Sequence, residues 1–180
     1  DDAASLDNLY IQTDAQLFGN TSYAEFGILL RAQGTPTQVL SSYQFKISTE
    51  GRWMFQAVDL TGAFVLQPWT RSSVLDTDTW TLGVLARGDT FYLYGNNTLL
   101  GTVTDDRMAD PGIFGLTVNP TTEQSDPAAV EFDNIIVTSR LGVTYRGMPV
   151  ALTEWDSSDP ADIKEELATT GQIQPAPARE

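Results

Sequence analysis

The chain has 180 residues and is strongly acidic, with 24 Asp and Glu against 10 Lys and Arg and a formal net charge of −14. Nucleic acids and anionic membrane surfaces are bound by basic faces, so this charge argues against both kinds of partner. The absence of Cys and His excludes disulfides, thiol nucleophiles and Ser–His catalysis, and it argues against zinc, copper and haem sites.

Alternation of apolar and polar residues predicts a series of short β-strands joined by tight turns. Gly88-Asp89 and Asn96-Asn97 are two-residue turns of the kind found in β-hairpins. The strands are expected at residues 9–17, 23–33, 42–48, 52–57, 63–67, 80–87, 91–95, 99–104, 113–118 and 129–139.

Two strand ends are predicted in more detail. Pro68 is expected to stop the fifth strand, because proline cannot donate to a ladder, and residues 69–78 are expected to form a polar loop. The period of two in the last strand places four residues on one face: Val130, Phe132, Asn134 and Ile136.

The alternation ends after Arg140. Asp159 as N-cap and Pro160 at the first helical position predict a short helix over residues 159–168, followed by an extended Pro- and Ala-rich tail. No apolar run approaches the ~20 residues that span a bilayer, so no direct membrane span is expected. The predicted organisation is an all-β jelly-roll β-sandwich of two antiparallel sheets in residues 1–140, with a C-terminal extension in residues 141–180.

Several of these strands resemble a known family. The runs TWTLGVLARGDTFYLYGNNTLLGTVT and GIFGL, and the closing strand VEFDNIIV, are similar to the later strands of concanavalin A-like lectin/glucanase (laminin-G-like) jelly-roll domains. YAEFGILLR and YQFKISTEGRW resemble the preceding strands. The resemblance implies a sandwich whose members include sugar-binding modules, glycosidases and adhesion domains. Such domains usually have a strand before the one at Leu9. Either the chain is trimmed, or residues 141–155 or a partner are expected to supply that strand.

The sharpest catalytic candidates are Glu131 and Asp133, which point to the same side of a strand. Glucanases of the family that the chain resembles use Glu-x-Asp-x-Glu, with two carboxylates flanking the sugar bond. Ile135 stands at the third position here. We therefore expect a solvent-facing acidic pair and no enzymatic activity.

Acidic residues in loops are candidate ligands for calcium, which prefers oxygen donors. The fold that the chain resembles often carries a structural calcium, but no Asp-x-Asp-x-Asp-Gly loop is present. A structural calcium and ordinary surface acids both remain open. The candidates are Asp76, Asp78, Asp105 and Asp106, with Asp110 nearby.

Aromatic side chains are candidates for stacking on sugar rings. Trp69, in the expected loop after Pro68, is the best of them. Tyr92 and Tyr94 face away from Phe91 and Leu93 and are expected to line the concave sheet. The alternative is packing in the sandwich, which we expect for Trp53 and Trp80.

These observations favour a non-catalytic binding module, most simply for carbohydrate, on an extracellular, cell-surface or periplasmic protein. A second hypothesis is a structural or assembly subunit of a larger complex, docked on a protein partner through a sheet edge and residues 141–180. A glycoside hydrolase is a third, which Ile135 disfavours. No cofactor is expected apart from the possible structural calcium.

Overall fold

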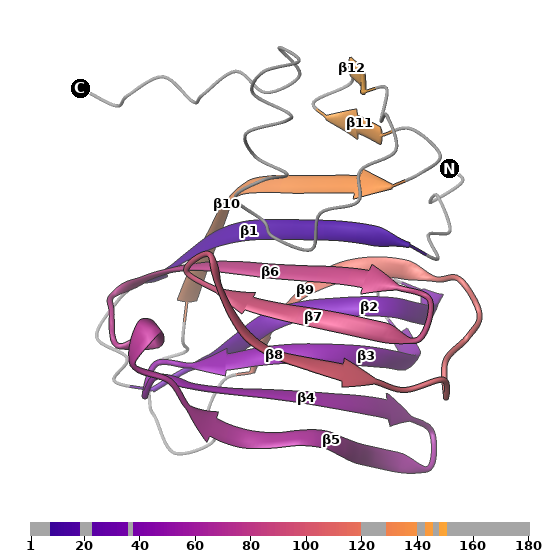
Figure 1. The fold of residues 1–180 in the computed structure, drawn as a ribbon, viewed down its shortest axis with the longest axis horizontal. Helices are drawn as coiled ribbons and strands as arrows, with labels where there is room; N and C mark the ends of the chain where they lie inside the picture. Colours follow the sequence, from indigo (N-terminus) through magenta and orange to yellow (C-terminus); the bar gives the residue numbers. More distant parts are fainter. Residues whose placement is uncertain are drawn as a thin grey trace.

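A computed structural model describes residues 8–18, 23–35, 38–119, 129–139, 143–145 and 148–150. Two antiparallel sheets of five strands pack face to face, as Figure 1 shows, which confirms the predicted all-β sandwich. One sheet has the order β10-β1-β6-β7-β8 and the other β5-β4-β3-β2-β9. No helix within the described ranges is long and apolar enough to cross a membrane.

The first sheet brings early and late parts of the chain together, because β1 pairs with the late strand β10 on one side and with β6 on the other. Its strands are β10 (Ala129–Ser139), β1 (Leu9–Phe18), β6 (Thr79–Arg87), β7 (Thr90–Gly95) and β8 (Thr98–Thr104). The second sheet consists of β5 (Gly62–Arg71), β4 (Arg52–Asp59), β3 (Gln38–Ser48), β2 (Glu25–Thr35) and β9 (Ile113–Asn119).

Alternate residues of the two sheets meet in one core, as the period of two requires. Phe26 of the second sheet lies edge-on to Trp80 of the first, with ring centroids 5.1 Å apart. Tyr43 and Phe55 pack against Phe91 at 4.6 and 5.0 Å. Each such buried side chain stabilises the fold by about 1.5–3 kcal/mol.

The tight turns are those that the sequence predicts. Asn96 and Asn97 both have positive φ, at 50° and 62°, as a type I′ hairpin between β7 and β8 requires. Gly88 has φ 54° at the turn between β6 and β7. Asn tolerates this left-handed region better than most residues, which explains the turn without glycine.

The strand β5 differs from the prediction, because it continues past Pro68 to Arg71. It is the edge strand of its sheet, so the missing amide of Pro68 costs no central ladder bond. Its pairing with β4 shifts between Trp53 and Phe55, which accommodates the extra residues as a bulge. Trp69 therefore lies in a strand, and the expected loop is shorter.

The face predicted for the last strand is also partly wrong. Val130 and Phe132 pack against the core, but a register shift at Asn134, whose φ is 51°, changes the side on which later residues lie. Ile136 is paired with Gln12, on the outer side, and Val137 packs inward instead. One extra residue in a bulge reverses every side chain that follows.

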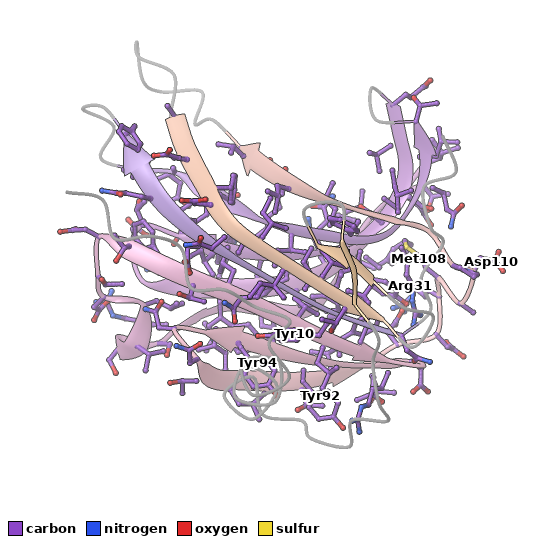
Figure 2. All side chains as sticks on the ribbon, turned by 90° about the horizontal axis from the view of Figure 1, so that it is seen from above. Tyr10, Arg31, Tyr92, Tyr94, Met108 and Asp110 are labelled. Carbon is purple, nitrogen blue, oxygen red and sulfur yellow. The ribbon has the colours of Figure 1, made fainter. Side chains whose placement is uncertain are left out.

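One end of the sandwich is closed by the segment that joins β8 to β9. Arg31, in a bulge of β2 with φ 49°, is buried, donates to the carbonyl oxygen of Met108 at 3.0 Å and lies over the ring of Phe91. Figure 2 shows Arg31, Met108 and Asp110 together at this end. A small hairpin of β11 (Val143–Tyr145) and β12 (Met148–Val150), which the sequence did not predict, follows β10. The predicted helix over 159–168 lies outside the described residues.

Candidate functional site

A groove of about 610 Å³ lies where the ends of β1, β6 and β10 meet. Its lining is mainly polar and comes from segments more than a hundred residues apart in sequence, which the β1–β10 pairing brings together. The principal polar lining residues are Asp14, Gln16, Thr81, Asn96, Glu131, Asp133 and Asn134, and Trp80 forms part of the wall.

The polar groups of the groove are held in place by one another. The Asp14 carboxylate accepts hydrogen bonds from Thr81 Oγ1 at 2.7 Å and from Asn134 Nδ2 at 2.8 Å. The positive φ of Asn134 in its bulge turns the amide toward β1. This network fixes the donors and acceptors before any ligand arrives, which lowers the entropic cost of binding.

Asn96 joins the turn between β7 and β8 to the same network. Its side-chain oxygen accepts from the backbone amide of Thr81 at 2.8 Å, and its Nδ2 donates to the carbonyl oxygen of Val74 at 2.6 Å. The groove thus has walls from β1, β6 and β10 and an end fixed by a hairpin turn.

Three carboxylates line the groove. Glu131 and Asp133 are exposed and lie opposite Gln16 and Asp14 in the β1–β10 register, as expected for a solvent-facing acidic pair. Asp14 is the third, and sequence reasoning missed it because no local motif marks it. Only the pairing of β1 with β10, at a separation of about 120 residues, reveals it.

The predicted aromatic residues do not form one platform. Trp69 is partly exposed on β5, whereas Tyr92 and Tyr94 lie on β7 in the other sheet. The tyrosines point away from the core, as predicted, because Phe91 and Leu93 fill it. Figure 2 shows them on the same side of the sheet as Tyr10. Trp80 is buried, as predicted, and donates from Nε1 to the carbonyl oxygen of Leu75 at 3.0 Å.

The calcium candidates are distributed over two loops. Asp76 forms an ion pair with Arg71 at 3.0 Å, and Asp105 pairs with Arg107 and accepts from Tyr43 Oη at 2.7 Å. Asp78 and Asp106 are exposed. In the part of the chain that the structure describes, no three acidic, His or Cys residues lie close enough together to hold a metal ion.

The β-sandwich fold is shared with solved structures of the lectin and glucanase-like, jelly-roll kind. Comparison of the sequence with protein-family models gives no match. Comparison with curated proteins gives no significant match either.

Solved structures share the fold. The carbohydrate-binding module CBM66 from Bacillus subtilis has a TM-score of 0.62 at 17% identity, over 76% of this chain and 78% of that one. Sheep galectin-11 has a TM-score of 0.52 at 10% identity, over 75% and 93% of the two chains. The alginate lyase A1-II′, of polysaccharide lyase family 7, has a TM-score of 0.52 at 12% identity, over 84% and 67%.

Proposed function

We propose that this protein is a non-catalytic carbohydrate-binding module and that the groove at the ends of β1, β6 and β10 binds the saccharide. The observation that carries the proposal is the preformed set of amide, hydroxyl and carboxylate groups around Asp14. Sugar hydroxyls both donate and accept, so they match such a mixed set. The fold shared with a carbohydrate-binding module and a galectin supports the same function.

The charge of the groove selects among saccharides. Asp14, Glu131 and Asp133 place three acidic groups along it, on a protein whose net charge is already −14. A polyuronate such as alginate would bring further carboxylates into this field, and like charges at close range repel. We therefore expect a neutral polysaccharide to be the ligand.

The arrangement of the acids supports binding without catalysis. Cleavage of a glycosidic bond by two carboxylates needs one as an acid and one as a base or nucleophile. Both oxygens of Asp14 already accept hydrogen bonds, and Asp133 Oδ1 accepts from the backbone amide of Asn134 at 2.8 Å. The residue two positions beyond Asp133 is Ile135, so the second glutamate of a Glu-x-Asp-x-Glu pattern is absent.

Binding to neutral polysaccharides and to alginate, measured by affinity gel electrophoresis and calorimetry, tests the proposal. Asn134→Gly keeps the positive φ but removes the amide, so it should weaken binding of a neutral polysaccharide roughly tenfold, the cost of about one hydrogen bond. Trp69→Ala and Tyr92→Ala, on other surfaces, are matched controls that should bind normally.

Three outcomes would contradict parts of this proposal. If Trp69→Ala lost binding while Asn134→Gly bound the polysaccharide normally, the binding site would lie on the outer side of β5 instead of in the groove. Release of sugar products that Glu131→Gln abolishes would make the protein an enzyme. Failure to bind any polysaccharide would overturn the function and favour the assembly hypothesis, which size-exclusion chromatography and crosslinking then test.

A further inference from the structure

The outer face of the first sheet carries a patch of large side chains at its centre. Two rows of neighbouring residues, each running across β10, β1, β6 and β7, define this patch. The first row is Thr138, Tyr10, Leu85 and Tyr92, and the second row is Ile136, Gln12, Gly83 and Tyr94. Gly83 leaves room between two rings, since a Cβ there would lie 3.3 Å from Tyr10 Oη and 3.4 Å from Tyr94 Cβ. We call the group of Tyr10, Gln12, Leu85, Tyr94 and Thr138 the tyrosine face.

The tyrosine face is buried although it points away from the core. Tyr10 and Leu85 are each 1% exposed and Tyr94 is 4% exposed, values no higher than that of the core residue Trp53 at 4%. The exposed fractions are higher at the border of the same face: Leu99 of β8, which pairs with Tyr94 of β7, is 50% exposed. A sheet with water on one side normally keeps polar, accessible side chains there, so another segment must pack on this centre.

The described strands supply no third layer over β1, β6 and β7. They form the two sheets and the β11–β12 hairpin, and Figure 1 shows that hairpin beyond β10, at the edge of the sheet. We propose that residues 151–180, the chain's own C-terminal segment, dock on the tyrosine face. This inference is independent of carbohydrate binding, because the groove lies at the end of the sheet and the tyrosine face at its centre.

The position and length of the segment fit this role. It begins after Val150, at the end of a hairpin that contacts edge strand β10. From β10 to β7 the face is about 15 Å wide, at ~4.8 Å per strand. Thirty residues can extend over roughly 100 Å, so the segment can cross the face with length to spare.

The composition of the segment also fits. Trp155, Ile163 and Leu167 supply apolar side chains that can cover tyrosine rings and Leu85. Seven acidic and two basic residues give residues 151–180 a negative charge, and Arg87 lies on the same outward row of β6 as Leu85. Attraction between Arg87 and the acidic segment would favour docking at this face over the other surfaces of an acidic protein.

Chemical labelling of tyrosines in the full-length protein, followed by mass spectrometry, tests the proposal. In the unaltered chain, Tyr10 and Tyr94 should be as protected as the core residue Tyr43. A full-length variant with Trp155→Ala, Ile163→Asp and Leu167→Asp should raise the labelling of Tyr10 and Tyr94 severalfold, to the level of Tyr92. Tyr43 must stay protected in that variant, which shows within the same molecule that the sandwich is folded.

Trp69→Ala, which removes an indole from the other sheet, is the matched control and should leave Tyr10 and Tyr94 protected. Equal labelling of Tyr10, Tyr94 and Tyr92 in the unaltered chain would overturn the proposal, because the face would be open. Continued protection of Tyr10 and Tyr94 in the triple variant would also overturn it. So would protection that disappears on dilution, since a second copy of the chain would then be the cover.

Discussion

At the scale of single residues, Tyr43 connects the core to the segment that closes one end of the sandwich. Its ring is fully buried against Phe91, its hydroxyl donates to Asp105 Oδ1 at 2.7 Å, and the hydroxyl oxygen accepts from the amide of Met108 at 3.1 Å. Burial and then the hydrogen bond to Asp105 raise the pKa of Tyr43 to about 12. Both effects disfavour the phenolate.

The raised pKa predicts a loss of stability at alkaline pH. In the unfolded chain Tyr43 ionises near its ordinary pKa of 10, while in the folded protein it keeps its proton up to about pH 12. Its contribution is therefore complete below pH 10 and is lost between pH 10 and 12, by on the order of 2 kcal/mol. Urea unfolding across this range measures the effect. Tyr43→Phe should reduce the fall of the unfolding free energy with pH. The part that remains comes from Tyr23, whose pKa is also raised to about 12.

Tyr43→Phe should also destabilise the protein at neutral pH, by about 1–3 kcal/mol, because it leaves the Met108 amide and Asp105 without their shared partner. Tyr92→Phe is the control, since it removes the same atom from a partly exposed ring. Equal urea midpoints for the two variants would show that the hydrogen bonds of the Tyr43 hydroxyl make no net contribution to the free energy of unfolding.

At the scale of elements, the close packing of the two sheets depends on a glycine in β8. A Cβ at Gly101 would lie 2.7 Å from Cη2 of Trp53, which belongs to β4 in the opposite sheet. Gly101→Ala must therefore displace a buried indole, and overpacking of this kind costs about 1–3 kcal/mol. Gly115→Ala in β9 is the matched control, because its Cβ would meet Leu29 at an ordinary 3.7 Å. Thermal unfolding of both variants distinguishes them, and similar melting temperatures would contradict the argument.

The strands also show what a sequence can predict and where it fails. Alternation predicted every strand of both sheets because each has one face in a common core, as in β1, where Leu9 and Ile11 are buried inward. Bulges are not visible in that pattern. The bulge at Asn134 changes the face on which Ile136 lies, and the irregular pairing of β5 with β4 keeps Trp69 in a strand where a loop was expected. Only pairing with a neighbouring strand reveals either irregularity.

The groove could not be predicted from the sequence, for a related reason. Glu131 and Asp133 could be paired from their spacing, but Asp14 joins them only through the long-range register of β1 with β10. The aromatic candidates were found as residues but not as a site, because sequence does not assign strands to sheets, and the structure puts Trp69 and Tyr94 in different ones.

At the scale of the whole molecule, the net charge of −14 opposes the compact state. With 24 acidic against 10 basic residues, ion pairs can offset only part of this repulsion. The Lys46–Glu25 pair, at 3.8 Å, is one of them and is well shielded, with side chains 8% and 24% exposed. Added sodium chloride should screen the repulsion between acids and raise the melting temperature by about 2–4 °C, the equivalent of about 1 kcal/mol for a chain of this size.

The same salt titration separates stability from recognition. A neutral saccharide held by hydrogen bonds releases no counterions, so its affinity for the groove should stay constant while the melting temperature rises.

Substituting the exposed acids Asp106 and Asp110 by Asn should raise the melting temperature at low salt and reduce its increase with salt, without changing the affinity. A melting temperature that falls with salt would show that ion pairs such as Lys46–Glu25 outweigh the repulsion. An affinity that falls with salt would indicate a charged ligand and contradict the neutral polysaccharide.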